Sequence, residues 1–250
     1  MRPEAIKKLM PARTRKAVRA RLGIGWPPVG WVRFGSLRRL TPVTRTFGFE
    51  RGQPIDRYYI EDFLRRHSGV EGYGVGDIRG RVLEVGDDSY TRAFGSAERV
   101  DVLSADVGNP AATIVADLGT GEGLPTDAFD CVICTQTLQF IYDVQGAVRA
   151  LEGALRPGGV VLATMHGIGQ ISRPDQDLWG EYWRFTSRSA RRLFEEAFAA
   201  ENVTVEAYGN VLAATGYLYG LAAEDLRREE LQLRDPDYEL VVAIRAVKRA

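Results

Sequence analysis

The chain has 250 residues, enough for one substantial hydrophobic core, so we expect one domain with a terminal extension rather than two full domains. Its 45% hydrophobic and 26% charged residues are typical of a soluble globular protein, and no apolar run reaches the roughly 20 residues of a membrane span. Lys and Arg together number 33, as do Asp and Glu, which gives no reason to expect a nucleic-acid partner.

The N-terminal region is strongly basic, whereas the remainder is net acidic. We expect residues 1–56 to form a basic arm with a lid or cap region, and residues 57–250 to form the main domain. Residues 1–22 have helical character but no apolar segment of the secretory type, which favours a cytoplasmic protein. Two interpretations stay open for this arm: a solvated extension, or weak peripheral contact with an anionic surface such as a membrane.

A helix is expected to begin near Pro54, and the turn at its start is rich in polar and aromatic residues. We expect this turn to close over a ligand, with Arg51 and Tyr59 contacting the substrate. The ring of Tyr58 would then face a cationic cofactor. The alternative is that the arginines form surface ion pairs and the tyrosines belong to the core.

The segment RVLEVGDDSY, residues 81–90, combines a buried strand with an acidic turn that starts at Gly86. Open α/β sheets bind ligands at such strand ends. The turn lacks the G-x-G-x-x-G pattern, and Asp87 and Asp88 would repel a pyrophosphate. Together with Glu84 they suit a cationic ligand, such as the sulfonium and ammonium of S-adenosylmethionine, and the alternative is an ordinary acidic loop.

From residue 81 onward, strands and helices alternate, which predicts a parallel sheet. The expected strands are 82–85, 99–103, 112–115, 129–134, 160–165, 203–208 and 240–247. The expected helices are 90–94, a short one ending at 141, 144–155, 187–198 and 212–225. Five parallel-type strands and a late pair fit a doubly wound α/β sheet.

The two cysteines, Cys131 and Cys134, have C-x-x-C spacing but lie within the strand expected at 129–134. Residues three apart in a strand point to opposite faces, so these thiols cannot converge on a metal, and we expect no metal site. Two buried free thiols are consistent with a reducing cytoplasm.

Candidate ligand-binding residues follow successive strands. They are Gly86, Asp87 and Asp88 after the first, Asp101 at the second, Asp117 and Leu118 after the third, Thr135 and Gln136 after the fourth, and His166 after the fifth. Because the carboxyl ends of neighbouring parallel strands share one edge, these residues should converge.

The segments VLEVGDD, VDVL, VADL, FDCVICTQTLQFIYD and LRPGGVVLAT resemble, in order and register, the class I S-adenosylmethionine-dependent methyltransferases over about Tyr58–Lys248. The segments RGQPIDRYYIEDFL and EYWRFT look like a bacterial subgroup associated with glycan and natural-product biosynthesis. The resemblance implies a seven-stranded, mostly parallel Rossmann-like methyltransferase fold with S-adenosylmethionine as cofactor.

The resemblance also implies roles for matching positions. Glu84, Gly86 and Gln136 would lie by the methionine portion, Asp101 at the ribose hydroxyls, and Asp117 with Leu118 at the adenine edge. The family's first motif usually continues with glycines, which Asp88 and Tyr90 replace here. Either the loop follows a different course with the aspartates bonding the ligand, or cofactor binding is weakened.

Methyl transfer requires mainly alignment of the acceptor, and a sugar hydroxyl also needs a proton acceptor. His166 is the expected base, with Asp175 and Asp177 as rivals and a plain hydrogen-bonding role for His166 as the alternative. The expected substrate-binding residues after strand four are Gln139, Tyr182, Trp183 and Arg184. The alternative for the aromatic loop is packing against the sheet.

The expected function is therefore methyl transfer to a small-molecule or glycan acceptor, by O-methylation of a sugar or natural-product hydroxyl. Three alternatives stay open: N-methylation of a natural product, a methyltransferase-like protein that binds the cofactor without turnover, and a Rossmann oxidoreductase. The acidic turn argues against the last of these. The oligomeric state is also left open, including a homo-oligomer.

Overall fold

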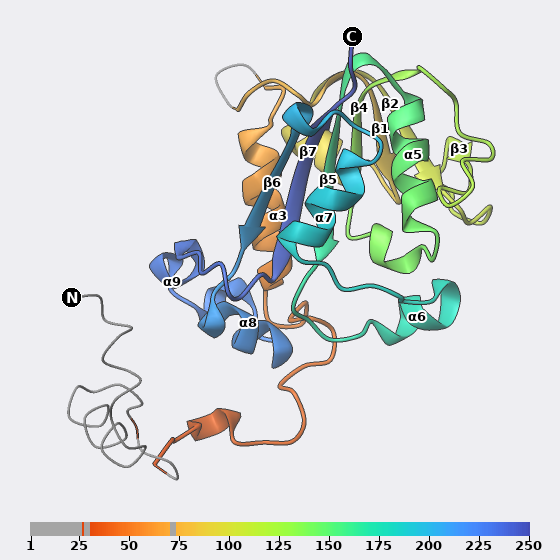
Figure 1. Ribbon diagram of the computed structural model, residues 1–250. Helices are drawn as coiled ribbons and strands as arrows, with labels where there is room; N and C mark the ends of the chain where they lie inside the picture. Colours follow the sequence, from red (N-terminus) through yellow and green to blue (C-terminus); the bar gives the residue numbers. More distant parts are fainter. Residues whose placement is uncertain (1–26, 28–30, 71–73) are drawn as a thin grey trace, which may run out of the picture. The chain divides into compact units, whose positions relative to one another are not determined.

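The computed structural model describes residues 27, 31–70 and 74–250, within two compact units, Met1–Thr41 and Pro42–Ala250 (Figure 1). In the first unit the described part contains a 3-10 turn, η1 (Gly35–Leu37). The arm expected over residues 1–22 lies outside the described residues. Residues 42–56, expected to belong with the arm and lid, are part of the second unit, where the Val43 amide donates to the Tyr219 carbonyl at 2.7 Å.

The second unit is built on a seven-stranded sheet with the order β3-β2-β1-β4-β5-β7-β6. The strands are β1 (Arg79–Val85), β2 (Ser96–Ser104), β3 (Ile114–Val115), β4 (Phe129–Thr135), β5 (Leu155–His166), β6 (Val203–Tyr208) and β7 (Val241–Val247). The first five pair in parallel, whereas β7 is antiparallel to both β5 and β6. The expected doubly wound, mostly parallel sheet is confirmed, and its strand order reverses between β1 and β4.

The helices follow the sequence pattern with two additions. Their bounds are α3 (Ile55–Arg66), α4 (Ser89–Phe94), α5 (Val144–Ala154), α6 (Arg173–Trp179), α7 (Ser187–Glu195), α8 (Val211–Leu218) and α9 (Arg228–Gln232), with 3-10 turns η2 (Leu138–Phe140), η3 (Ala200–Asn202) and η4 (Ala223–Asp225). The helices α6 and α9 were not expected. The helix expected over 212–225 ends early, because Gly220 takes a left-handed φ of 68° directly after α8.

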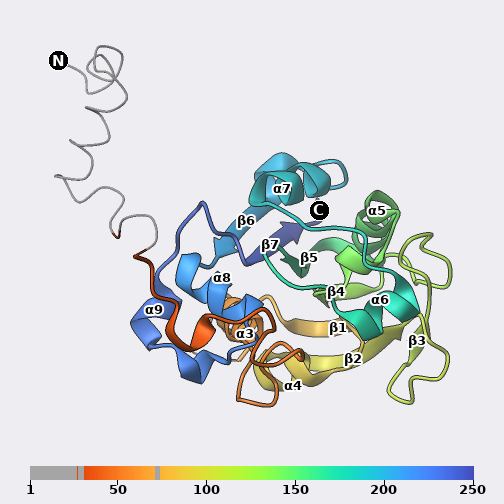
Figure 2. The ribbon, with the colours of Figure 1, turned by 90° about the horizontal axis from the view of Figure 1, so that it is seen from below.

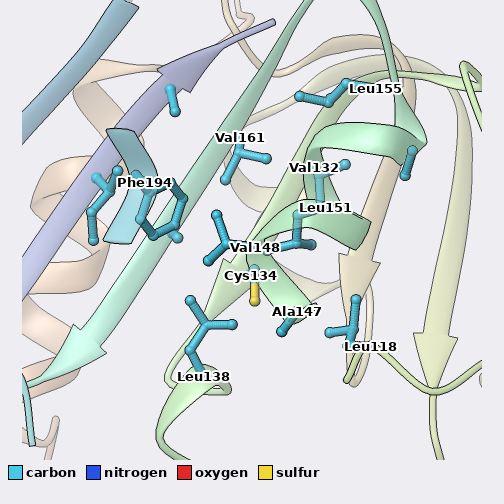
Figure 3. Packing of buried hydrophobic residues seen from close by; sticks show 14 of the residues in the cluster. Leu118, Val132, Cys134, Leu138, Ala147, Val148, Leu151, Leu155, Val161 and Phe194 are labelled. Atoms are coloured by element: carbon cyan, nitrogen blue, oxygen red, sulfur yellow. The ribbon is translucent and has the colours of Figure 1, made fainter. Parts of the chain in front are cut away.

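Helices cover both faces of the sheet, each over its own hydrophobic cluster (Figure 1). On one face α5 and α7 contribute Val148 and Phe194 to the cluster that also contains Cys134 (Figure 3). On the other face α3, α8 and α9 cover a cluster that includes Phe63 and Cys131. The two free, buried cysteines therefore belong to opposite faces, as the C-x-x-C spacing within a strand predicts.

Burial on both faces explains why the central strands are nearly continuous apolar runs. In β4, for example, Cys131, Val132, Ile133 and Cys134 are all fully buried. Across residues 31–70 and 74–250, no helix combines the length and the apolar character needed to cross a membrane.

Candidate active site

Two adjoining clefts lie at the carboxyl edge of the parallel strands, where the strand order reverses; Figure 2 views the molecule from this edge. The smaller cleft has a volume of about 770 Å³ and the larger about 1120 Å³. Val85, Gln136, Phe140 and Asp175 line both. A crevice at this position is where open α/β sheets bind ligands.

The smaller cleft lies between the start of α3, the acidic turn and the end of β4. Gln53 and Arg57 line it from α3 and the preceding turn, Asp87 and Tyr90 from the acidic turn and α4, and Thr135 from β4. Residues of the turn at the start of α3 therefore border this cleft. The arginine that lines the smaller cleft is Arg57 rather than the expected Arg51. The tyrosine that lines it is Tyr90 rather than Tyr58 or Tyr59.

Glu84 shows how the acidic turn is held together. Its side chain is buried, and its carboxylate accepts hydrogen bonds from the Tyr90 amide at 3.0 Å and from the Thr91 amide and hydroxyl at 2.7 and 2.6 Å. Burial raises the pKa of this carboxyl, and the bonds from Thr91 and Tyr90 oppose the rise. Although Glu84 borders the smaller cleft, its oxygens are committed to the start of α4.

The larger cleft lies over the ends of β1, β2 and β3. Gly86, Asp117 and Leu118 line it. The Gly86 backbone has a φ of 97°, and its carbonyl accepts a bond from the Asn109 side chain at 2.8 Å, which ties the first turn to the loop after β2. Three exposed aromatic residues, Tyr142, Trp179 and Tyr182, also line this cleft.

Gln136 lies where the two clefts meet and has a left-handed backbone, with a φ of 49°. Its amide donates to the Thr164 carbonyl at 2.8 Å, and its carbonyl accepts a bond from the Gln139 side chain at 2.8 Å. A non-glycine residue held at positive φ costs roughly 1–3 kcal/mol, and such residues cluster at functional sites. The bonds to Thr164 and from Gln139 fix the backbone of Gln136, so the residue is held at the junction of the two clefts.

Both clefts are acidic. The acidic lining residues are Glu61, Glu84, Asp87, Asp117, Glu122, Asp143 and Asp175. Among the described residues, Arg57 is the sole basic side chain that lines either cleft. This balance suits a ligand with positive charge and disfavours a phosphate-rich one. No cluster of three His, Cys, Asp or Glu side chains in the described part of the chain could hold a metal ion.

Asp101 corrects one expectation. It lies within β2, three residues before that strand ends, and pairs with Leu83 of β1. Its buried carboxylate accepts hydrogen bonds from Arg81 at 2.8 Å and from Arg99 at 3.0 Å. It is therefore an internal ion-pair residue that does not reach either cleft. The residues at the carboxyl end of β2 are Ser104, which lines the larger cleft, and the exposed Asp106 just beyond it.

Three further expectations change at the start of α3 and in the acidic turn. Tyr59 is a core residue, 2% exposed, whose ring packs on Tyr208 at 5.5 Å, so it cannot contact a substrate. Tyr58 packs edge-on against Tyr59 at 5.5 Å and lines neither cleft. Asp88 also lies outside both clefts and forms an ion pair with Arg92 at 2.5 Å.

Of the five residues expected to bind the substrate besides Tyr59, only Tyr182 lines a cleft. Arg51 forms an ion pair with Asp225 at 2.5 Å, and Gln139 is buried beneath Gln136. The Trp183 ring donates to the Ile141 carbonyl at 3.0 Å, and Arg184 pairs with Glu181 at 2.6 Å. For Trp183 and Arg184 these contacts agree with the packing alternative, and for Arg51 the contact agrees with the ion-pair alternative.

His166 is the last residue of β5, as predicted, but its side chain is 6% exposed and lines neither cleft. Gly169 lies against its Nε2, since a Cβ at position 169 would collide with that atom. Burial, with the charges of Arg184 and Arg57, lowers the pKa of His166 to about 3, so the imidazole is neutral. In this arrangement Nε2 has no hydrogen-bond partner among the described residues.

The helix α6 brings an acid to the site instead. Asp175 lines both clefts, and its Oδ2 accepts a bond from the Ser172 hydroxyl at 2.6 Å. Asp177, the other rival, is exposed and lines neither cleft. The Ser172 amide is held by Glu181 at 2.8 Å, which fixes the start of α6. The sequence signals missed here were the Ser172 and Pro174 at the helix start.

Comparison with known families gives the class of the domain. Residues 72–163 match the model of a family described as a methyltransferase domain. This match, which includes β1 to β4 and most of β5, confirms the expected enzyme class, an S-adenosylmethionine-dependent methyltransferase, and its cofactor. No curated protein matches the sequence.

Solved structures share the fold at low sequence identity. The [4+2]-cyclase SpnF has a TM-score of 0.52 and 16% identity, over 80% of this chain and 85% of the cyclase. A phosphoethanolamine N-methyltransferase from Haemonchus contortus has a TM-score of 0.49 and 17% identity, over 77% of this chain and 53% of that one. An S-adenosylmethionine-dependent methyltransferase from Mesorhizobium loti has a TM-score of 0.47 and 14% identity, over 78% and 98%. The chain thus spans about half the length of the Haemonchus enzyme.

Proposed function

We propose that this protein transfers the methyl group of S-adenosylmethionine to a hydroxyl oxygen of a small molecule or glycan, such as a sugar or natural product. The observation that supports this most is the pair of clefts that meet at Gln136 and Asp175, one for each end of the cofactor. The acidic lining favours a cofactor that carries sulfonium and ammonium charges.

Each end of the cofactor has residues that suit it. In the larger cleft Leu118 offers an apolar surface for the adenine, and Asp117 and Gly119 offer polar groups at its edge. Asp106, just past the end of β2, replaces Asp101 as the candidate for the ribose hydroxyls. Gly86 and Gln136 would then flank the methionine portion, Thr135 would lie beside it, and Asp87 would face the ammonium group.

The proposed chemistry depends on alignment and on one proton. When bound, S-adenosylmethionine supplies an activated methyl group. The chain has to hold the acceptor oxygen in line with that group and accept its proton. Asp175 is the better candidate for the proton acceptor than His166, because its carboxylate lies at the junction of the clefts whereas the imidazole is covered by Gly169.

The lining of the clefts also restricts the acceptor. With Arg57 as the one basic lining residue among those described, an acceptor rich in phosphate or carboxylate groups would meet mostly acidic side chains. The exposed rings of Tyr142, Trp179 and Tyr182 offer flat faces on which a sugar or a planar natural product could stack. A neutral, hydroxyl-bearing acceptor fits both features.

A methyl-transfer assay with labelled S-adenosylmethionine tests this proposal. The acceptor panel should contain matched hydroxyl, amine and phosphorylated forms of simple glycosides and phenolic natural products. We expect label in a hydroxyl-bearing acceptor and none in its phosphorylated counterpart. Label only in the amine members would instead support N-methylation, which the acidic clefts also permit.

A protein that binds the cofactor without turnover is the second candidate. The replacement of the usual glycines by Asp88 and Tyr90 favours it. Tight calorimetric binding of S-adenosylmethionine with no label transfer to any acceptor would support this candidate over the enzyme.

We further propose a cytoplasmic location, which the two free buried thiols support. Weak membrane contact through the basic arm remains a proposal of its own. It predicts that the protein co-sediments with anionic vesicles and that deletion of residues 1–22 abolishes this. Unchanged co-sedimentation of the deletion variant would rule out that role for the arm.

A further inference from the structure

Most of the large apolar side chains that the structure describes in the first compact unit are exposed to solvent. They lie in residues 31–40, WVRFGSLRRL, which we call the aromatic–arginine segment. None of residues 31–41 is buried. A group of exposed apolar side chains bordered by charge is typical of a surface that contacts another molecule or a membrane. The exposed apolar residues are Trp31 at 67%, Val32 at 43%, Phe34 at 52% and Leu40 at 107%.

Three exposed arginines are interleaved with these apolar side chains. Arg33 lies inside the first apolar group, and Arg38 and Arg39 directly precede the last apolar residue of the segment. The positive charge continues on both sides, because eleven Lys and Arg residues and no Asp or Glu occur between Glu4 and Glu50. Basic residues next to exposed apolar ones favour a partner surface that is negatively charged and has an apolar interior.

The turn η1 joins the two halves of the segment. The Leu37 amide donates to the Phe34 carbonyl at 3.0 Å, and the Arg38 amide donates to the Gly35 carbonyl at 3.2 Å. Gly35 has a left-handed φ of 55°, which a glycine adopts without strain. A turn of this kind brings its first and fourth Cα atoms within about 7 Å. Phe34 and the arginines after the turn therefore lie close together rather than spread along an extended chain.

The surface of an anionic bilayer matches this composition. Tryptophan is enriched at the level of the lipid headgroups, where its ring is partly in apolar and partly in hydrated surroundings. Arginine binds phosphate and keeps its charge in water while its aliphatic part contacts apolar groups. A nucleic acid offers phosphates and flat bases, but little that an exposed aliphatic side chain such as Val32 or Leu40 can contact. These aliphatic residues therefore favour lipid over nucleic acid.

We propose that the aromatic–arginine segment inserts its apolar side chains into the surface of an anionic phospholipid bilayer while its arginines bind the lipid phosphates. The segment is a contact surface beyond the basic arm of residues 1–22, and it depends neither on the role of that arm nor on the methyltransferase assignment. The arm supplies charge that attracts the bilayer from a distance, and the segment supplies the apolar contact.

Co-sedimentation of the full chain with vesicles tests this proposal. One set of vesicles contains equal parts of phosphatidylglycerol and phosphatidylcholine, and the other contains phosphatidylcholine alone. Trp31→Ser/Phe34→Ser/Leu40→Ser should lower the partition coefficient onto the mixed vesicles by about tenfold or more, because it removes the apolar area that enters the bilayer. Arg38→Gln/Arg39→Gln should also lower it by about tenfold, since each basic residue near an anionic surface strengthens binding.

A matched control removes exposed apolar side chains from the second unit instead. Val75, Val211 and Leu233 are 68%, 52% and 63% exposed, and their joint replacement by Ser should change the partition coefficient by less than about twofold. None of the altered residues is buried, so the thermal unfolding of every variant should match that of the unaltered protein.

Fluorescence separates insertion from attraction by charge alone. Brominated lipids should quench the tryptophan fluorescence of the bound protein. Trp31→Phe should keep the binding, because the ring stays apolar, and should lose part of the quenching. Binding without any quenching would contradict insertion of the segment.

The outcomes separate this inference from the other proposals. Loss of binding in the Trp31, Phe34 and Leu40 variant but not in the control supports it, whatever deletion of residues 1–22 does. If that deletion abolishes binding and the segment variant does not weaken it, the contact belongs to the arm alone and the inference is wrong. Absence of binding to both vesicles overturns the inference and the arm's role together and leaves methyl transfer unaffected. Binding of a single-stranded DNA oligonucleotide in place of vesicles would also overturn it.

Discussion

Asp175 and Asp177 lie two positions apart on α6 and differ in what they border. Asp175 lines both clefts, whereas Asp177 is exposed outside them. If Asp175 accepts the acceptor's proton, Asp175→Asn should lower kcat for a hydroxyl acceptor by about 10²- to 10⁴-fold, the usual contribution of a general base. Asp177→Asn is the matched control and should retain activity. The measurement is initial-rate methyl transfer at saturating cofactor.

Calorimetry on the same Asp175→Asn protein distinguishes catalysis from binding. The affinity for S-adenosylhomocysteine should stay within about twofold, because the proposed role concerns the proton and not the cofactor. If both substitutions at positions 175 and 177 lower kcat equally, the assignment of the base is wrong.

A second residue-scale prediction concerns a buried network outside the clefts. The Asp77 carboxylate accepts two bonds from Arg245 at 2.8 Å each and one from His67 at 2.7 Å. Burial would raise the pKa of Asp77, but the bonds from Arg245 and His67 outweigh it and lower the value to about 2. Because this folded-state pKa is below the ordinary one, the ion contributes about 2 kcal/mol above pH 4, and that stability is lost as the pH falls toward 2.

Denaturant unfolding at several pH values measures this contribution. Asp77→Asn should lower the free energy of unfolding by roughly 3 kcal/mol at pH 7, since it leaves the Arg245 charge unpaired. The difference between the two proteins should shrink between pH 4 and pH 2. A difference that is independent of pH would show that the Asp77 charge is not what stabilises the fold.

At the scale of elements, α4 depends on a residue of the preceding strand. Glu84 caps the start of this six-residue helix through the amides of Tyr90 and Thr91. Glu84→Ala should lower the free energy of unfolding by roughly 3 kcal/mol, because it leaves buried donors without an acceptor. Glu98→Ala, at an exposed position of β2, should change stability by less than about 0.5 kcal/mol. Equal losses in thermal or denaturant unfolding would contradict a capping role for Glu84.

Elements with a strong periodic signal were predictable, and elements decided by local bonding were not. The apolar run around β4 and the Gly158 turn before the apolar part of β5 follow directly from composition. The seven residues of α6 have no buried apolar stripe, so no periodicity reveals them. The start of α6 is fixed by two hydrogen bonds, from the Ser172 hydroxyl to Asp175 and from the Ser172 amide to the Glu181 carboxylate. The sequence alone does not show that Glu181 lies next to Ser172.

The same reason explains which of the expected residues lie at the clefts. Asp117, Thr135 and Gln136 lie at or just past strand ends, and strand ends share one edge whatever the side chains do. Asp101 was misplaced because β2 continues three residues beyond it. His166 was placed correctly at a strand end, but only the packing of Gly169 shows that its ring is covered.

At the scale of the whole chain, all residues that line the clefts lie between Phe49 and Tyr182, within the second compact unit. Deletion of residues 1–41 should therefore leave the affinity for S-adenosylhomocysteine within about twofold of the full chain, since no lining residue is removed. Calorimetry on the shortened protein measures this. A loss of cofactor binding would show that the first unit contributes to the site.

The most direct test of the account is a crystal structure with S-adenosylhomocysteine bound. We predict the adenine beside Leu118 in the larger cleft, the sulfur near Gln136, and the amino-acid end of the ligand in the smaller cleft. A ligand bound in the reverse orientation, at another place on the molecule, or not at all would contradict the assignment of the two clefts to one cofactor.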